Sequence, residues 1–237
     1  MKFKSNLAHI PFGSDSDKPF NDIGCEKKMA FEIMTPREIE EKSMATIVSE
    51  LNGRTWPEPE FSIVKRCIHT TADFDYADNL VFSKDAAKIG VEALKNGAHI
   101  VTDTKMAASG INKNRLSAYG GEVHCYISDP EVIEEAKRLG CTRATVEMRK
   151  AAKLDKPLIF AIGNAPTALV EIHRMIKEEG LRPALIVGMP VGFVNVVESK
   201  ELIMDLDDIP YIVAKGRKGG SNVAAATINA MLYSLGR

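Results

Sequence analysis

The first sustained pattern of apolar and polar positions begins near residue 35. Thr35 precedes Pro36, and Glu38 stands three positions after Thr35, which is typical of a helix N-terminus. Apolar side chains then return at helical spacing in one stripe, which consists of Ile39, Met44, Ile47, Val48 and Leu51. Gly53 follows the stripe as a typical terminator. We therefore predict an amphipathic helix between these points.

Apolar positions at helical spacing resume at about residue 59 and predict a second helix that ends at about residue 69. Its apolar face consists of Phe61, Val64, Cys67 and Ile68. Arg66 and His69 are three positions apart, so their side chains share a different face of this helix. A pair of polar side chains is thus expected to project together from a helix that is otherwise buried.

From Ser83 onward, short apolar runs alternate with amphipathic segments. The apolar runs predict strands at 99–104, 122–127, 157–163, 184–190 and 210–216. The amphipathic segments predict helices at 83–97, 129–140, 142–153, 167–180, 198–206 and 221–236. Ser83 is the expected N-cap of the first of these helices, and Asp129, followed by Pro130, is that of the second.

Near-continuous apolar strands separated by helices are typical of a parallel sheet that is buried on both faces. We therefore expect a single α/β domain over residues 35–237, with a mainly parallel sheet flanked by helices on both faces. Residues 1–34 show no sustained periodicity. They are expected to form an N-terminal arm that is either flexible or docks on the domain.

Composition excludes several classes of protein. Apolar residues make up 45% of the chain and charged residues 27%, with a formal net charge of -1, so the broad basic surface of a nucleic-acid binder is not expected. No apolar run reaches the roughly 18–20 residues that cross a bilayer, and the N-terminus lacks the apolar segment of a signal peptide. The four cysteines form no C-x-x-C pair. We expect a cytoplasmic protein with free thiols and no membrane or nucleic-acid partner.

Loops rich in glycine and polar residues follow four of the predicted strands. They begin at Thr102, Ile162, Val187 and Ala214. Ligands of open parallel sheets bind beyond the carboxyl ends of the strands, where glycines permit close approach and helix starts attract anions. The loops are either ordinary tight turns of an α/β fold or the site of a large polar or anionic ligand. The last loop adds three cations, which are Lys215, Arg217 and Lys218.

Neither glycine-rich fingerprint of nucleotide-binding sites occurs in the chain, so no nucleotide cofactor is expected. No group of cysteines and histidines has the spacing of a zinc finger, and no metal site is expected. Four of the histidines are interpreted as structural or solvated, namely His9, His99, His124 and His173. His69 differs because it ends a helix beside Arg66, although a histidine at a helix end also interacts favourably with the helix dipole without doing chemistry.

Five segments together resemble the precorrin-8X methylmutase family in order and spacing. They read RCIHTTAD, FSKDAAKIGVEALKNGAHIVTDTKMAASGI, GNAPTAL, IVGMPVGFVNVVESKE and GRKGGSNVAAATINAM. The resemblance covers residues 35–237. It implies an α/β fold and an isomerase of cobalamin biosynthesis that moves a methyl group from C11 to C12 of a precorrin-8 macrocycle, with or without cobalt. It further implies a homodimer that needs no cofactor.

The resemblance also implies roles for individual residues. The family's catalytic histidine corresponds to His69 within R-x-x-H, where it is expected to act as general acid. Histidine suits that role because its unperturbed pKa of about 6.5 keeps both protonation states accessible near neutrality. The implied substrate-binding residues are Ser43, Arg66, Met106, Ser109, Gly110 and Arg143.

A planar macrocycle also needs a broad apolar slot. The side chains expected to line it are Met106, Met189, Val191 and Phe193. Two other functions compete with the methylmutase. One is an enzyme that uses a nucleotide, which the absent phosphate-binding fingerprints disfavour. The other is a corrinoid carrier without catalytic activity, which the presence of His69 disfavours.

Overall fold

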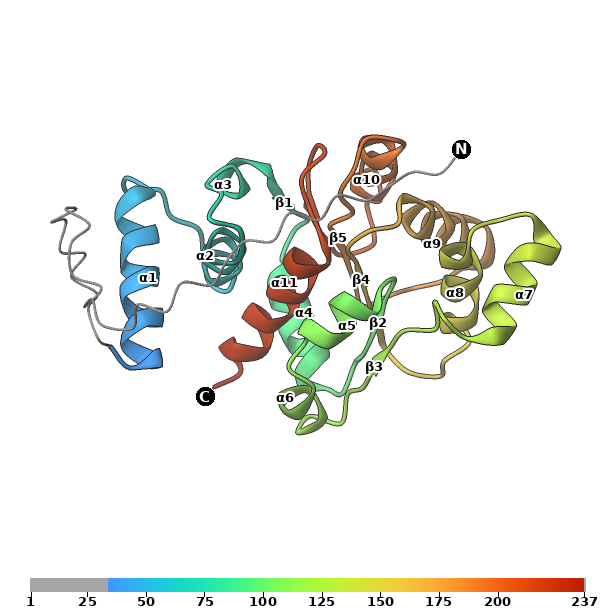
Figure 1. Ribbon diagram of the computed structural model, residues 1–237, viewed down its shortest axis with the longest axis horizontal. Helices are drawn as coiled ribbons and strands as arrows, with labels where there is room; N and C mark the ends of the chain where they lie inside the picture. The colour runs from blue at the N-terminus through green and yellow to red at the C-terminus, as the bar shows by residue number, and fades with distance from the viewer. Residues whose placement is uncertain (1–33, 237) are drawn as a thin grey trace, which may run out of the picture. The chain divides into compact units, whose positions relative to one another are not determined.

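The computed structural model describes residues 34–236, and the predicted arm over residues 1–34 lies almost wholly outside the described residues. Six strands form one sheet in the order β1-β6-β5-β4-β2-β3 (Figure 1). Their bounds are Leu80–Phe82 for β1, His99–Thr102 for β2, Val123–His124 for β3, Leu158–Ile162 for β4, Leu185–Gly188 for β5 and Tyr211–Ala214 for β6. β1 runs antiparallel to β6, and every other neighbouring pair is parallel.

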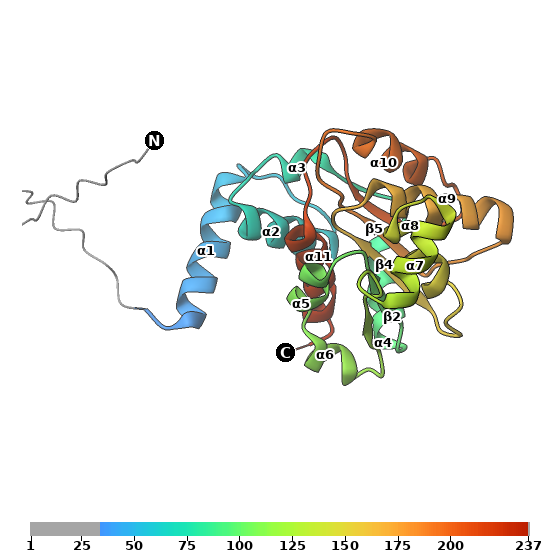
Figure 2. The same ribbon diagram turned by 45° about the vertical axis from the view of Figure 1, so that its right-hand side comes forward.

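Helices cover both faces of this sheet, as Figures 1 and 2 show. On one face, a large apolar core joins the sheet to α2 (Glu60–Thr71), α4 (Ala86–Lys95) and α11 (Ser221–Ser234). On the other, a second core joins it to α8 (Arg143–Ala151), α9 (Pro166–Glu179) and α10 (Val196–Met204). The four residues of β2, the five of β4 and the four of β5 are all buried, because both of their faces are covered.

The remaining helices pack around these layers. They are α1 (Pro36–Glu50), α3 (Tyr76–Asn79), α5 (Lys105–Gly110), α6 (Lys113–Ser117) and α7 (Pro130–Leu139). α1 lies against α2, α5 against α11 and α7 against α8. Among the described residues, no helix is both long and apolar enough to cross a bilayer. The three described cysteines are free thiols, namely Cys67, Cys125 and Cys141.

The predicted α/β architecture is confirmed, and so is much of the local structure. α1 begins at Pro36 and α7 at Pro130, the two positions where proline is favoured. Gly140 adopts a φ of 64° just after α7, where only glycine enters the left-handed region without strain. The local pattern therefore determines where these helices begin and end.

The predicted helix start at Ser83 is wrong. α4 begins at Ala86, and Ser83 instead pairs with the sheet edge. Its backbone N–H donates to the carbonyl oxygen of Tyr211, and its Oγ accepts from the Tyr211 N–H at 2.9 Å. The Ser83 hydroxyl thus closes the end of the β1–β6 pairing. This role depends on Tyr211, which lies far along the chain from Ser83.

The predicted strand at 122–127 is also shorter than expected, because β3 contains only Val123 and His124. The backbone leaves the sheet at Tyr126, whose N–H donates to the Glu147 side chain at 2.5 Å rather than to β2. β1, α3, α5 and α6 have too few residues to show a period, and the sequence did not predict them.

Candidate active site

The four glycine-rich loops lie at one edge of the sheet, as predicted, because β2, β4, β5 and β6 are parallel. Asp103, which is 2% exposed, joins the first two loops. Its carboxylate accepts hydrogen bonds from the backbone N–H groups of Gly163 (2.8 Å), Asn164 (2.8 Å) and Ala165 (2.6 Å). Burial raises the pKa of this carboxyl, and the three N–H groups partly oppose that rise by stabilising the charge.

The loop after β6 is held by a buried lysine on α10. Lys200 is fully buried and donates to the carbonyl oxygens of Gly216 at 2.7 Å and Lys218 at 2.8 Å. Burial lowers its pKa to about 8. Gly219 in the same loop touches the preceding loop so closely that a Cβ there would stand 2.2 Å from the carbonyl oxygen of Met189. The loop after β6 is therefore held in place by Lys200 and by its close packing against the loop after β5.

Two hydroxyls connect the helices that begin at this edge. The Oγ1 of Thr104, the N-cap of α5, lies 2.7 Å from the Oγ of Ser221, the first residue of α11. α11 packs against α5 and also against α2. Figures 1 and 2 show α11 between these two helices. α11 thus connects the carboxyl edge of the sheet to α2, the helix that carries His69.

His69 and Arg66 line one cavity of about 450 Å³, so the structure confirms that this predicted pair shares one face. His69 lies in the last turn of α2, where the side chain is exposed to solvent. Ala72 caps the helix, and its N–H donates to the Ile68 carbonyl oxygen from a left-handed backbone.

A tyrosine and a second arginine complete this cavity. The guanidinium carbons of Arg66 and Arg115 lie 5.2 Å and 5.6 Å from the centroid of the Tyr233 ring. Arg115 Nε also donates to the Leu232 carbonyl oxygen at 2.7 Å, near the end of α11. Two cations are therefore fixed on one aromatic ring beside His69.

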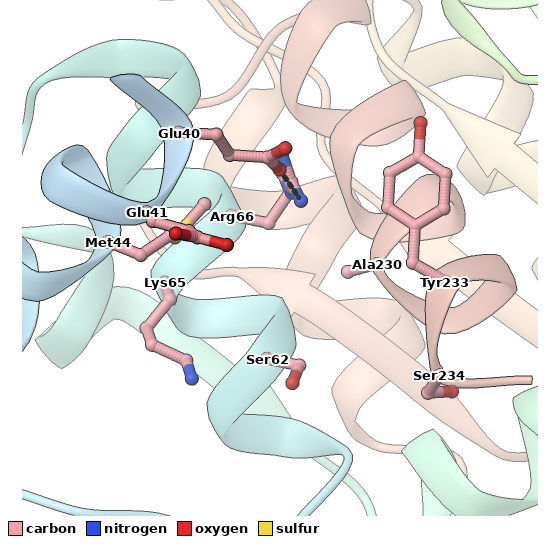
Figure 3. Close-up of a pocket in the computed structure, with 9 residues that line it drawn as sticks. All are labelled: Glu40, Glu41, Met44, Ser62, Lys65, Arg66, Ala230, Tyr233 and Ser234. Atoms are coloured by element: carbon pink, nitrogen blue, oxygen red, sulfur yellow. Dashed lines mark hydrogen bonds and ion pairs between the residues drawn. The ribbon is translucent and has the colours of Figure 1, made fainter. Parts of the chain in front are cut away.

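A neighbouring cavity of about 390 Å³ shares Arg66, Glu40 and Tyr233 with the first. Figure 3 shows Glu40 of α1 meeting Arg66 of α2, with Tyr233 facing them from α11. The Arg66 Nη2 donates to the Glu40 Oε1 at 2.8 Å. A guanidinium carries five N–H groups. This one bond therefore leaves Arg66 able to bind a further carboxylate.

Arg143 lies in a different cavity, of about 560 Å³, at the carboxyl edge of the sheet. Asp103, Thr104 and Asn164 line the same cavity. Arg143 is the first residue of α8, and its Nη1 reaches the Ile127 carbonyl oxygen at 3.5 Å. The structure thus separates Arg143 from the cavity of His69 and Arg66.

Glu147, one turn after Arg143 on α8, is a buried acid. It is fully buried, and its Oε2 has no hydrogen-bond partner among the described residues. Burial raises its pKa from 4.5 to about 7, against the hydrogen bond that its other oxygen accepts from the Tyr126 N–H. The folded protein therefore keeps this acid protonated over a wider pH range than the unfolded chain does.

This burial predicts a stability that falls with rising pH. Between the ordinary pKa of 4.5 and the folded pKa of about 7, the folded protein holds a proton at Glu147 that the unfolded chain has released. The free energy of unfolding is therefore expected to fall by about 2–3 kcal/mol as the pH rises from 5 to 8. A Glu147→Gln variant should lack this part of the fall. Urea unfolding of both proteins across that range measures it, and parallel curves would contradict the prediction.

The other predicted binding residues lie outside these cavities. Ser43 does not line the His69 cavity, and its Oγ donates to the Ile39 carbonyl oxygen within α1 at 2.8 Å. Met106 (71% exposed) and Ser109 point away from the core on α5. Gly110 packs against α11, where a Cβ would stand 2.9 Å from that of Ala225. The sequence pattern cannot distinguish such a packing glycine from a ligand-binding one.

Two expectations for the loops need correction. Met189 is fully buried in the core, so it does not line a slot. Val191 and Phe193 are exposed at the surface, and neither lines one of the cavities described above. Lys218 is engaged in ion pairs with Asp73 and Asp75, which are carboxylates of the chain itself. Arg115 and Tyr233 of this site were not predicted from the sequence. The only signal for either residue in the sequence was Tyr233 itself, an aromatic residue with a polar hydroxyl at the end of the small-residue segment that forms α11.

Comparison with known proteins identifies the family to which the chain belongs. The family model for precorrin-8X methylmutase matches residues 38–234 of the chain. The chain belongs to the precorrin-8X methylmutase family. It is thus an isomerase of cobalamin biosynthesis, and the family suggested by the sequence motifs is confirmed.

Individual members of the family resemble the chain over most of its length. A cobalt-precorrin-8 methylmutase of Priestia megaterium is 47% identical over 196 residues, which cover 83% of this chain and 87% of the relative. A precorrin-8X methylmutase of Pseudomonas aeruginosa is 39% identical over 191 residues, with coverages of 80% and 91%. A crystal structure of the precorrin-8x methyl mutase from Thermus thermophilus superimposes with a TM-score of 0.77 at 40% identity, with coverages of 83% and 94%.

Proposed function

We propose that this methylmutase moves a methyl group from C11 to C12 of a precorrin-8 macrocycle, with His69 as the general acid. The observation that carries the proposal is the placement of His69 in one cavity with two arginines on an aromatic ring. A precorrin is fringed with carboxylates, and arginine binds carboxylates in a bidentate manner. A cavity of about 450 Å³ is also within the size range of small-molecule sites.

In the proposed mechanism, protonated His69 donates its proton to a ring nitrogen near the migrating methyl group. The added charge withdraws electrons from the conjugated system and favours migration of the methyl group to the neighbouring carbon. His69 takes the proton back after the shift, so the reaction is a net isomerisation. General acid catalysis contributes about 10²–10⁴-fold. Binding that favours the transition-state shape of the ring supplies the remainder.

The reaction is tested by mixing the purified protein with precorrin-8X and, separately, with cobalt-precorrin-8, and by following the absorbance spectrum over time. Relatives carry both substrates in their names, so either form is a candidate for this chain. Conversion to the rearranged corrin is expected, and the faster substrate identifies the natural form. Binding without conversion would support a corrinoid carrier instead, and no binding would contradict the proposed substrate class.

Arg66 is proposed to hold a substrate carboxylate. Arg66→Ala removes both the charge and the fork of N–H donors, so KM is expected to rise by about 10–100-fold, as for a lost hydrogen bond to a charged group. Arg66→Lys keeps the charge and should weaken binding less. Steady-state kinetics with both variants measures the difference. Equal losses would indicate bidentate recognition, and unchanged KM values would remove Arg66 from the binding site.

We further propose that the family's remaining substrate contacts apply here, namely Ser43, Met106, Ser109, Gly110 and Arg143.

We also propose that the protein is a homodimer. α1 offers exposed apolar side chains for association, Ile39 (52% exposed) and Val48 (43% exposed). Light scattering coupled to size-exclusion chromatography measures the mass directly. A monomer at micromolar concentration would contradict the dimer.

A further inference from the structure

Two histidines and a glutamate converge at the edge of the sheet, outside the candidate active site. β3 is the edge strand and pairs with β2 so that Val101 lies opposite His124. Side chains alternate between the faces of a strand. His99, Glu122 and His124 therefore project from the same face of this pair of strands. None of the three lines the cavity of His69 or that of Arg143.

The three side chains place one ligand atom each in a small volume. The Nδ1 of His99 lies 2.8 Å from the Nε2 of His124, which lies 4.0 Å from the Oε2 of Glu122. One such atom from each residue lies within 4.8 Å of the other two. His99 is 8% exposed, whereas the Glu122 side chain is 70% exposed. The group is thus buried on the protein side and open to solvent through the carboxylate.

Imidazole nitrogens and a carboxylate are ligands that Zn²⁺ and related divalent ions prefer. Only the neutral imidazole binds a metal. Burial lowers the pKa of His124, and the neighbouring His99 lowers it further, against the opposing effect of Glu122.

A second contact orients His124. The hydroxyl of Tyr126 lies 3.1 Å from the Nδ1 of His124, the ring nitrogen that faces away from His99. If Nδ1 donates its proton to the tyrosine oxygen, the Nε2 lone pair is left for a metal ion. Histidines that ligate metals are characteristically fixed in this way by a hydrogen bond at the other nitrogen.

We propose that His99, Glu122 and His124 bind one divalent transition-metal ion such as Zn²⁺. Zinc ligands stand about 2.0–2.2 Å from the ion. A small rotation of the His124 ring replaces the hydrogen bond between the two rings by two metal–nitrogen bonds. Glu122 then supplies the third ligand and water the fourth. The ion would fasten the two-residue strand β3 to β2, and its binding does not depend on the proposed reaction.

The test is isothermal titration of the untagged, chelator-treated protein with ZnCl₂ at neutral pH. One equivalent is expected to bind in the wild-type protein. His99→Ala and His124→Ala should abolish this binding. Tyr126→Phe should weaken it by about tenfold, the smaller effect expected when a residue orients a ligand without touching the metal. His173→Ala, a histidine of α9 outside the cluster, is the matched control and should bind like the wild type.

A measurement on the wild-type protein avoids any folding defect of the variants. In NMR spectra of protein with ¹⁵N-labelled histidine, ZnCl₂ should shift the ring nitrogens of His99 and His124 while those of His173 stay in place. No bound equivalent, or equal affinity in the His124→Ala variant, would overturn the proposal. The cluster would then be only a chain of hydrogen bonds that holds the edge strand.

Discussion

A His69→Ala variant is expected to fold, bind the macrocycle and lose the methyl shift, with kcat reduced by about 10²–10⁴-fold. The reason is that His69 is the only histidine among the described residues that line its cavity, and the proposed mechanism routes the proton through its imidazole. Its side chain is exposed at the end of α2, so its removal should change the free energy of unfolding by about 0.5 kcal/mol or less. KM should change little, because the arginines remain.

Single-turnover absorbance with the substrate established in the first assay measures this loss, and thermal unfolding of the same sample checks the fold. His173→Ala is the matched control, since it removes the same type of side chain from α9 and should leave turnover intact. A His69→Ala protein with wild-type kcat would exclude His69 as the acid. A protein that unfolds would make the role of His69 structural instead.

The second large effect is expected at Asp103. Asp103→Ala leaves three backbone N–H groups without their acceptor, of which that of Gly163 is buried. Each hydrogen bond to a charged group contributes about 1.5–3 kcal/mol. The carboxylate no longer has to be buried, which offsets part of the loss. We expect the free energy of unfolding to fall by about 3–5 kcal/mol.

Urea unfolding followed by circular dichroism measures this change. Asp78→Ala is the control, because its side chain is 68% exposed and forms one surface ion pair with Arg54. Removing such a pair costs about 0–1 kcal/mol. A loss at Asp103 no larger than that at Asp78 would show that the loops after β2 and β4 are held by other contacts.

Local periodicity was sufficient to predict most of the regular structure. α7 follows from proline at its start, glycine at its end and one apolar stripe, all within eleven residues of sequence, Pro130 to Gly140. The parallel sheet follows from apolar runs separated by helices. The elements that were missed or misplaced depend on partners elsewhere in the chain. Ser83, for example, pairs with Tyr211 and so cannot cap a helix of its own.

The candidate site likewise has features that local sequence predicts and features that depend on distant contacts. The sequence placed Arg66 and His69 on one face of a helix, because helix geometry fixes residues three positions apart. It also placed four glycine-rich loops at one edge of the sheet. It could not predict that Arg115 reaches α11, since that contact joins residues 117 positions apart.

The amino-acid sequence by itself thus determined the family, the parallel α/β architecture and the helix that carries His69, because each of these depends on patterns within one segment or on the order of segments. The tertiary structure alone decided which side chains surround His69, why Met189 is buried while Phe193 is exposed, and how Asp103 joins two loops. Each of those outcomes depends on contacts between segments far apart in the chain, such as those of α11 with α2 and α5, and such contacts leave no periodic signal in the sequence.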